Sequence, residues 1–212
     1  MENKKQIKIV IDILKNEYPE AGCTLIYNSP IQMLIAARLS AQCTDARVNL
    51  VTPALFAKYK TVYDFAKADP QKIEKYIYSC GFYNMKSKDI VGMSQKISEK
   101  HNGIVPDNIE ELTDLPGVGR KTANLILGEI YKKPAVITDT HFIRVTGRLG
   151  FHNTKNAAKV ENIMRKILTE SESTDFCHRI LAHGRLICKS QNPECHKCVL
   201  SKVCDYNNKT SA

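Results

Sequence analysis

Apolar residues recur at helical spacing along most of this chain, and that periodicity limits its possible folds more than any other feature. Ile7, Val10, Ile11 and Leu14 fall on one face of a first helix. Strand-like alternation and β-hairpin turn signals are nearly absent. The sequence therefore predicts an all-α fold, with further helices at 33–39, 48–58, 62–66, 70–79, 86–101, 109–113, 140–149, 157–168 and 174–188.

The segment LPGVGRKTAN, residues 115–124, places a Gly-x-Gly turn before a helix that is predicted to run to about Tyr131. Gly117 and Gly119 let backbone amides approach an anion closely, and the free N–H groups of a helix start favour negative charge. The same positive helix end disfavours a charged ammonium, so we expect Lys121 to give up its proton readily. A neutral lysine amine is a nucleophile for Schiff-base chemistry. A phosphate-binding turn and a reactive lysine amine in the same short segment together indicate chemistry on a nucleic acid.

Two plainer interpretations of this segment stay open on the residues alone. Gly-x-Gly turns before helices are common, and most lysines in a first helical turn are solvated surface charges. The hairpin could also hold a phosphate without doing any chemistry.

The charge balance suits a polyanionic partner without proving one. Lysine and arginine number 31 against 22 acids, which gives a net charge of +9. No signal-peptide pattern is visible, and no apolar run approaches the length needed to span a membrane. We therefore expect a cytoplasmic protein with no membrane partner. In that reducing compartment, cysteines are core residues or metal ligands more often than disulfides.

Four cysteines stand in a short polar segment with the spacing C-x6-C-x2-C-x5-C: Cys188, Cys195, Cys198 and Cys204. The segment has too few apolar residues to fold without a cross-link such as a bound metal group or a disulfide. A zinc ribbon normally pairs two C-x2-C knuckles, and only one is present here. Four thiolates in one compact loop favour a 4Fe-4S cluster, with zinc and then disulfides as the alternatives. His196 is interpreted as a bystander, and buried structural roles are predicted for the scattered Cys23, Cys43, Cys80 and Cys177.

Several motifs follow one another in a specific order: LSAQCTD (39–45), GFYN (81–84), LPGVGRKTAN (115–124), DTH (139–141), HGR (183–185) and the four-cysteine spacing. In this order they resemble the endonuclease III family of helix-hairpin-helix DNA glycosylases and abasic-site lyases, which repair oxidised pyrimidines. The resemblance runs from Leu14 to Tyr206. It implies two helical domains flanking a DNA-binding cleft. One would span 22–132, with the helix-hairpin-helix at about 108–131; the other would join 1–21 to 133–212 and carry a 4Fe-4S cluster in the loop 188–204.

The resemblance also implies a reaction and a partner. Lys121 would attack the sugar C1′ of a flipped, damaged nucleotide, form a Schiff base and cleave the strand by β-elimination. Asp139 would stabilise positive charge at C1′ and move protons, although Asp-Thr-His is also a good helix N-cap. The expected partner is double-stranded DNA with damaged bases or abasic sites. We expect a monomer associated with the nucleoid of a prokaryotic cell.

Further positions are assigned to DNA contact by the same resemblance. Gln42 would fill the gap left by the flipped nucleotide, and Phe82 would be a wedge between bases where leucine is common. The alternatives are an ordinary polar residue near a helix end for Gln42 and a core residue for Phe82. The remaining contacts are predicted at Gly117 and Gly119 for a phosphate, at His141 and Arg144 for the DNA backbone, and at Asp45 for ordering the pocket or capping a helix.

The chain departs from the family pattern in two places. Thr138 precedes the predicted catalytic Asp139 where valine is usual. The loop 189–194 has one lysine and one glutamate where relatives often have several basic residues, so we expect a weaker salt dependence of DNA binding.

Two rival functions stay open at this stage. One is a mismatch glycosylase that removes adenine. Such enzymes usually lack a lysine after the hairpin and often carry a further C-terminal domain, so Lys121 and the short stretch after Cys204 argue against it. The other is a non-enzymatic DNA-binding module that holds zinc.

Overall fold

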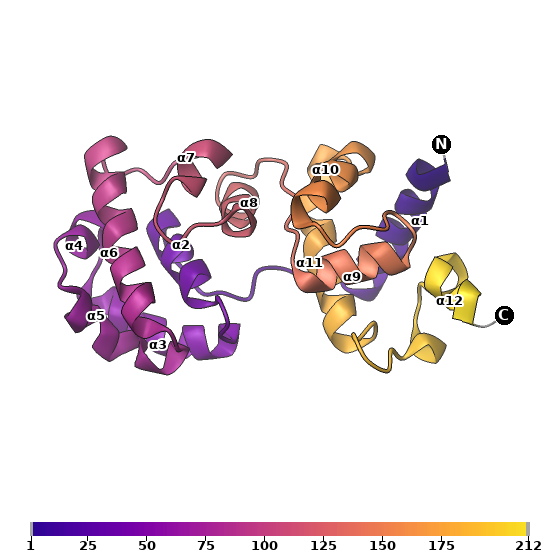
Figure 1. The fold of residues 1–212 in the computed structure, drawn as a ribbon, viewed down its shortest axis with the longest axis horizontal. Helices are drawn as coiled ribbons and strands as arrows, with labels where there is room; N and C mark the ends of the chain where they lie inside the picture. The colour runs from indigo at the N-terminus through magenta and orange to yellow at the C-terminus, as the bar shows by residue number, and fades with distance from the viewer. Residues whose placement is uncertain (1, 211–212) are drawn as a thin grey trace. The chain divides into compact units, whose positions relative to one another are not determined.

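The computed structural model describes residues 2–210, and the chain in it divides into two compact units. Unit 2 runs from Thr24 to Tyr131, and unit 1 joins the chain up to Cys23 with the chain from Lys132 onward. Every regular element in the described residues is a helix, so the all-α prediction is confirmed (Figure 1). No helix among residues 2–210 is both long and apolar enough to cross a membrane.

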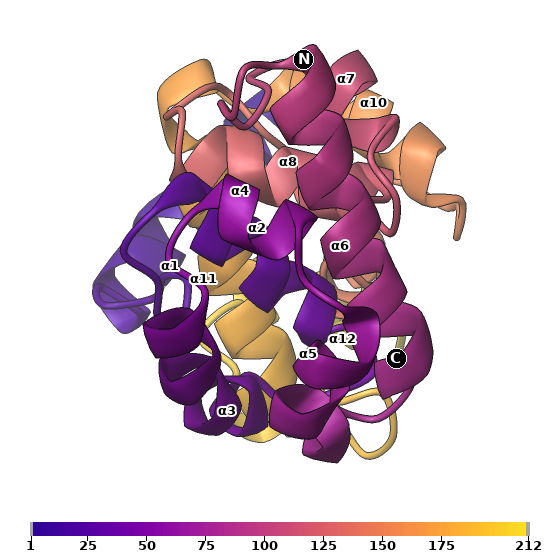
Figure 2. The ribbon, with the colours of Figure 1, turned by 90° about the vertical axis from the view of Figure 1, so that its left-hand side faces the viewer.

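Unit 2 is built around one long helix, α6. Its elements are α2 (Pro30–Leu39), α3 (Asp45–Lys58), α4 (Val62–Ala66), α5 (Pro70–Ile77), the 3-10 turn η1 (Tyr78–Cys80), α6 (Tyr83–Lys100), α7 (Ile109–Thr113) and α8 (Arg120–Glu129). The short helices α4 and α5 pack along α6 (Figure 2). Helix α2 is almost entirely buried, because seven of its ten residues are core, and it packs against α8. Helix α2 therefore connects α8 to the core of unit 2.

Side chains fix where most of these helices begin. Ser29, Thr44, Thr61, Asp69 and Asn108 each accept a hydrogen bond from a backbone amide of the first turn that follows. Helices α6 and α8 have no capping side chain, and the N-cap of α6, Phe82, has a left-handed backbone. Helix α6 consequently starts at Tyr83, three residues earlier than the sequence predicts.

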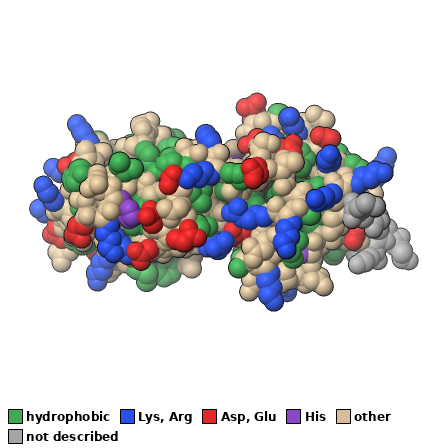
Figure 3. Space-filling view, turned by 90° about the horizontal axis from the view of Figure 1, so that it is seen from above, with side chains coloured by type: hydrophobic (Ala, Val, Ile, Leu, Met, Phe, Trp, Pro, Cys, Tyr) green, Lys and Arg blue, Asp and Glu red, His purple; other side chains and the backbone are tan. Residues whose placement is uncertain are grey.

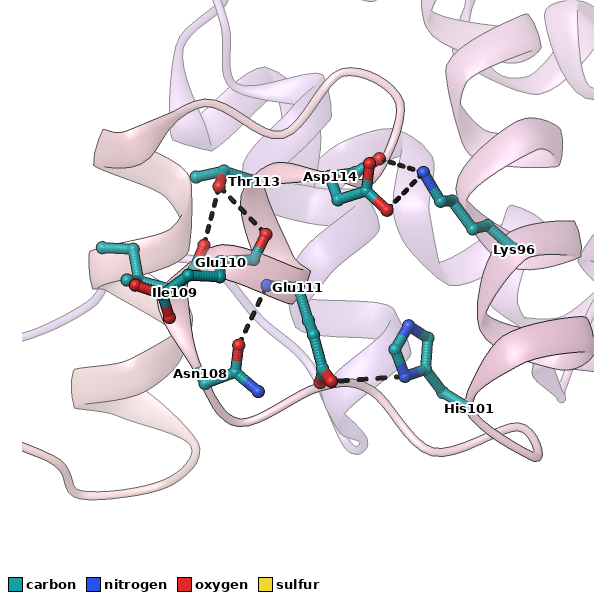
Figure 4. A network of polar contacts seen from close by, with 8 residues as sticks. All are labelled: Lys96, His101, Asn108, Ile109, Glu110, Glu111, Thr113 and Asp114. Atoms are coloured by element: carbon teal, nitrogen blue, oxygen red, sulfur yellow. Dashed lines mark hydrogen bonds and ion pairs between the residues drawn. The ribbon is translucent and has the colours of Figure 1, made fainter.

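Helix α7 is tied to the end of α6 by a network of polar contacts (Figure 4). The Lys96 ammonium lies 2.6 Å from the Asp114 carboxylate and donates to its carbonyl, also at 2.6 Å. His101 Nδ1 lies 3.8 Å from Glu111 Oε2, and Asn108 Oδ1 accepts from the Glu111 amide at 2.9 Å. These contacts fix the helix that enters the glycine turn.

Unit 1 gathers the first helix with those that follow Lys132. Its elements are α1 (Glu2–Glu17), α9 (Thr140–Arg148), α10 (Ala157–Ile167), η2 (Glu170–Glu172), α11 (Ser173–Leu186), η3 (Cys195–Lys197), η4 (Ser201–Val203) and α12 (Asp205–Thr210). Ile7, Val10, Ile11 and Leu14 are buried, so the predicted face of the first helix is confirmed. Helix α11 packs against both α1 and α9. The sequence predicts a frayed tail from Asn207, which is wrong as far as Thr210, because α12 continues to that residue.

Candidate functional site

The glycine turn between α7 and α8 leaves a helix start without a side-chain cap. Leu115 and Val118 are buried and anchor the turn, and the Val118 amide donates to the Leu115 carbonyl at 3.1 Å. Gly117 has a φ of 73°, in the left-handed region that favours glycine. Gly119 is the N-cap of α8 and has no side chain to accept from the first-turn amides. Those amides can therefore receive an anion from solvent.

Lys121 is the second residue of α8 and is exposed to solvent. Its neighbours on the inner face of the helix, Ala123 and Asn124, are fully buried. The lysine is thus carried on a rigid helix directly beside the uncapped amides. The structure thus places the exposed Lys121 and the glycine turn at one helix end, whereas the reactivity of the amine and the binding of an anion there stay predictions.

Asp139 is placed by a buried extended segment of unit 1. Residues Ala135 to Thr138 are buried, and their amides reach α11: Ala135 N–H donates to Ser173 Oγ at 3.1 Å and Ile137 N–H donates to Cys177 Sγ at 3.2 Å. Burial raises the pKa of Cys177 to about 12, so this acceptor stays an uncharged thiol at neutral pH. The segment delivers Asp139, half-buried, to the start of α9.

Asp139 is also the N-cap of α9, as its sequence context allows. Its Oδ1 accepts from the Phe142 amide at 2.6 Å. The cap fixes the carboxylate in one orientation and uses Oδ1 alone, so the second oxygen is available for chemistry. The capping and catalytic interpretations are compatible.

Gln42 and Phe82 share an uncommon backbone conformation. Gln42 has a φ of 55° and Phe82 a φ of 47°, both in the left-handed region that bulky residues rarely occupy. Gln42 lies in the loop between α2 and α3, and Phe82 lies between η1 and α6. Both side chains are exposed, Phe82 to 61%. The core alternative for Phe82 is therefore wrong, and an exposed aromatic side chain on a strained backbone is typical of a functional position.

Arg144 connects α9 to the cysteine segment. Its Nη2 lies 3.0 Å from His141 Nδ1 and donates to the Gly184 carbonyl at 2.8 Å, while its Nε donates to the Cys188 carbonyl at 3.0 Å. Gly184 lets the two helices approach, since a Cβ there would lie 3.0 Å from that of His141. His141 and Arg144 are thus side by side, and contact of either with DNA stays a prediction.

Asp45 does not cap its helix. The N-cap of α3 is Thr44, whose Oγ1 accepts from the Arg47 amide at 3.2 Å. Asp45 Oδ2 instead accepts from Thr24 Oγ1 at 2.6 Å, which ties the start of α3 to the segment before α2. The capping alternative is wrong, and a role in ordering the pocket stays a prediction.

The four cysteines of the C-terminal segment line one small pocket that is partly open to solvent. Arg148, Pro193 and Tyr206 are among the other lining residues. Burial, followed by the charges of the other three cysteines, raises the pKa of Cys198 to about 11. Four cysteine sulfurs line this one pocket, so the donor set fits a positively charged group whose binding would release the thiol protons.

Arg148 holds the cysteine segment in place and was not predicted from the sequence. Its Nη1 donates to the Lys189 carbonyl at 2.7 Å and to Cys188 Sγ at 3.3 Å, and its Nη2 donates to the Ser190 carbonyl at 3.0 Å. Its guanidinium also lies over the Tyr206 ring, 4.7 Å from the centroid. The helical spacing of Arg144 and Arg148 is the signal that could have indicated this role.

Two histidines and two lysines near the cysteines lie in different environments. His183, buried in α11, lies 3.4 Å from Cys198 Sγ through Nε2 and 3.0 Å from the Tyr18 hydroxyl through Nδ1. His196 is exposed. The sequence also predicts that Lys189, Lys197 and Lys202 can offset the negative charge of the cysteine site. In the structure, Lys189 and Lys197 pair with Glu194, at 2.6 and 3.0 Å. Of the scattered cysteines, Cys80 and Cys177 are buried as predicted, whereas Cys23 and Cys43 are only half-buried.

Basic side chains are spread over the surface. Lysines and arginines are scattered across the face seen in Figure 3, with acidic side chains between them. The net charge of +9 therefore acts as a broad positive field that attracts a polyanion.

The chain is similar to one protein-family model, to curated relatives and to solved structures. Residues 35–170 match the model of the HhH-GPD superfamily base excision DNA repair protein. The endonuclease III of Synechocystis sp. is 43% identical over 206 residues, which cover 96% of this chain and 94% of that one. Two solved structures are 40% identical: a non-covalent endonuclease III–DNA complex, with a TM-score of 0.91 and 98% of each chain covered, and a trapped endonuclease III–DNA covalent intermediate, with a TM-score of 0.92 and 99% of each chain covered.

Proposed function

The chain belongs to the endonuclease III family of the HhH-GPD superfamily, and from this premise we propose that Lys121 is its nucleophile and Asp139 its catalytic carboxylate. The chain is a base-excision repair enzyme, a DNA glycosylase with abasic-site lyase activity. The observation that carries the residue assignment is the exposed lysine at an uncapped, glycine-led helix start. A trapped covalent intermediate of a related endonuclease III with DNA supports a covalent reaction on DNA for this family.

The reaction begins when the neutral amine of Lys121 attacks C1′ of the damaged nucleotide. The bond between C1′ and the base breaks, and the base leaves with a proton. Opening of the sugar ring gives a protonated imine between C1′ and Nζ. The imine makes the proton on C2′ acidic. When this C2′ proton leaves, its electron pair moves toward the imine, and the bond from C3′ to the phosphate oxygen then breaks. Hydrolysis of the imine then frees the lysine.

Asp139 supports the early steps. Its fixed carboxylate stabilises the positive charge that develops at C1′ and moves protons during attack and ring opening. The N-cap bond from Phe142 and the buried segment Ala135–Thr138 keep it from rotating away. These contacts make Asp139 a preorganised group rather than a mobile surface acid.

The DNA contacts follow from the two strained loops and the hairpin. The uncapped amides after Gly117 and Gly119 receive a backbone phosphate. Gln42 fills the space left by the flipped nucleotide, and the exposed Phe82 stacks between bases. Flipping costs a few kcal/mol, and a poorly stacked oxidised pyrimidine lowers that cost. We propose oxidised pyrimidines in double-stranded DNA as substrates and a monomeric enzyme in the bacterial cytoplasm.

The four cysteines would hold a 4Fe-4S cluster. Cys188, Cys195, Cys198 and Cys204 supply the thiolates, and Arg148 with His183 contributes hydrogen bonds to the sulfurs. A bound cluster supplies an electron-transfer centre and a covalent staple for a segment with little core of its own. Arg144 and Arg148 connect that staple to α9, whose first residue follows Asp139.

An assay on a panel of labelled duplexes tests the proposal. We expect base release and strand cleavage with thymine glycol or dihydrothymine, and none with adenine opposite 8-oxoguanine. Asp139→Asn, which keeps an oxygen for the cap, should lower the rate of base release by about 100-fold or more. Release of mismatched adenine without strand cleavage would favour the adenine glycosylase. Tight binding without any product would favour the non-enzymatic module.

A further inference from the structure

A buried lysine of unit 2 joins two helix ends that lie close to the left-handed residues. Lys86 lies in the first turn of α6 and is only 1% exposed. Its Nζ donates to the Leu39 carbonyl at 2.8 Å and to the Cys80 carbonyl at 2.9 Å. Leu39 is the last residue of α2, and Cys80 is the last residue of η1. One nitrogen therefore bridges the ends of two helices.

The two hydrogen bonds satisfy both the lysine and the helix ends. The last carbonyls of a helix have no partner within it, and a cation is favourable at this negative end. A buried ammonium in turn needs acceptors, because removing an unpaired charge from water is costly. Burial lowers the pKa of Lys86, as expected for an amine removed from water. The bridge is therefore a built feature of the interior of unit 2.

Both bridged helix ends lead directly into a strained position. Gln42 follows Leu39 by three residues and has a φ of 55°. Phe82 follows Cys80 by two residues and has a φ of 47°. Lys86 also holds Phe82 from the other side, because its backbone amide donates to the Phe82 carbonyl at 3.0 Å. A left-handed backbone at a bulky residue persists only where surrounding contacts hold it, and Lys86 supplies such contacts to both loops.

We propose that Lys86 is a positioning residue that holds Gln42 and Phe82 at a fixed spacing before DNA arrives. This inference rests on the proposed function, in which both side chains enter the duplex beside the flipped nucleotide. Because Lys86 is buried, it acts on the DNA only through these two side chains. Two side chains that are already correctly spaced lose less freedom on insertion than two mobile loops would, so the flipped state forms more readily.

Loss of the bridge should slow base release more than it weakens general DNA binding. A misplacement of about 1 Å at positioning groups can cost about 100-fold in rate. Lys86→Met removes the donors and keeps an unbranched side chain of similar length. We expect it to lower the single-turnover rate of thymine glycol release at least about tenfold. Affinity for an undamaged duplex, in which no nucleotide has to be flipped, should stay within about twofold of the native value.

Hydrogen exchange measured by mass spectrometry tests the bridge without DNA. The native full-length protein is compared with Lys86→Met and with the control variant Ile97→Ala. The control leaves a cavity at a fully buried position of the same helix, about 16 Å along its axis from Lys86, and so destabilises the protein away from both loops. We expect the amides of 40–44 and 80–84 to exchange faster in Lys86→Met than in the native protein or the control. Native exchange there in Lys86→Met, or an equal increase in both variants, would overturn the bridge.

A double-mutant cycle tests whether Lys86 acts through the two side chains. The rate cost of Lys86→Met is measured in the native background and in a protein that also carries Gln42→Ala and Phe82→Ala. We expect that cost to fall below about threefold in the second background, because the groups that Lys86 positions are then absent. An equal cost in both backgrounds would show a general structural effect and overturn the proposal. If Lys86→Met does not fold, Lys86→Arg replaces it in both tests, because the broader guanidinium displaces at least one of the two carbonyls.

The outcomes separate this inference from the proposed function. A slow rate with Gln42→Ala and Phe82→Ala, together with a native rate in Lys86→Met, would refute the positioning role alone. A native rate with Gln42→Ala and Phe82→Ala would refute the proposed DNA contacts, and the positioning role with them. A native protein that acts on no lesion would refute the proposed function, and hydrogen exchange would still decide whether Lys86 holds the two loops.

Discussion

Arg38 and Asp89 form an ion pair directly beneath the glycine turn of the hairpin. Arg38 Nη2 lies 2.6 Å from Asp89 Oδ2, and both side chains are less than one-fifth exposed, at 13% and 19%. A Cβ on Gly117 would lie 2.6 Å from Arg38 Nε and 2.7 Å from Asp89 Oδ2. The ion pair therefore fills the space beside Gly117 and fixes the position of the turn relative to α2 and α6.

Gly117→Ala should destabilise the protein for two reasons. The methyl group collides with the ion pair, and alanine is disfavoured at a φ of 73°. We expect a loss of about 2 kcal/mol or more, measured as a drop of several degrees in the thermal unfolding midpoint.

Gly119→Ala is the matched control for that substitution. A Cβ on Gly119 meets no atom within 4 Å, and its φ of −90° suits any residue. Gly119→Ala should lower the unfolding midpoint by less than Gly117→Ala does. The loss in the free energy of unfolding should be at most about 1 kcal/mol. DNA affinity should fall, because the methyl group enters the space in front of the uncapped amides. Equal destabilisation by the two substitutions would contradict this account of the turn.

Glu194→Gln should make DNA binding more sensitive to salt. Hydrogen bonds from Lys189 and Lys197 lower the pKa of Glu194 to about 2, so the carboxylate is charged at any working pH and masks both lysines. Removing its charge should steepen the slope of log K against log[salt] by about 1–2. Glu99→Gln, the same change on α6, serves as the control. If both variants keep the native slope, the cysteine segment lies away from the DNA.

Arg148→Ala should make the proposed cluster less durable. The substitution removes the hydrogen bonds that Arg148 donates to the Lys189 and Ser190 carbonyls and to Cys188 Sγ. We expect cluster absorbance to disappear about tenfold faster in air. Arg148→Lys should be intermediate, because one ammonium cannot reach all three acceptors. A native rate of loss in Arg148→Ala would show that the arginine does not support the segment.

His152 should make stability depend on pH near neutrality. Burial lowers the pKa of His152, and its Nε2 lies 2.9 Å from Thr146 Oγ1. The unfolded chain, with an ordinary histidine pKa of about 6.5, then binds the proton more readily than the folded one. The neutral imidazole of His152 therefore stabilises the folded protein above about pH 6.5, and this stabilisation is lost as the pH falls below that value. Between pH 7.5 and 5.5 the unfolding midpoint should therefore fall further for the native protein than for His152→Gln, and an equal fall would contradict the assignment.

The sequence predicts helices well here because local signals mark their starts. Apolar spacing and the capping residue Asp139 act within a few residues of the chain, and the structure confirms both. The start of α6 was misplaced because Phe82 turns the chain through a left-handed backbone, which no propensity of phenylalanine predicts. The tail was misjudged because polar composition alone does not exclude a short helix such as α12.

The candidate site was predictable where one motif supplies it and unpredictable where distant segments meet. The Gly-x-Gly turn and Lys121 are adjacent in the chain, so backbone physics drew attention to them, while their proposed role came from the resemblance to the endonuclease III family. The Arg38–Asp89 ion pair and the hydrogen bonds of the buried Lys86 join residues from different helices and loops. Such contacts depend on how the helices pack, which one sequence does not determine. The roles of Lys121 and Asp139 stay predictions.

Borohydride trapping tests the central assignment of Lys121 most directly. The protein is mixed with a labelled duplex that contains thymine glycol, sodium borohydride is added, and the products are separated on a denaturing gel. We predict a covalent protein–DNA band for the native protein and none for Lys121→Ala, which should fold normally because the side chain is exposed. A band of equal strength in Lys121→Ala, or an alkali-sensitive site without any band in the native protein, would contradict the account.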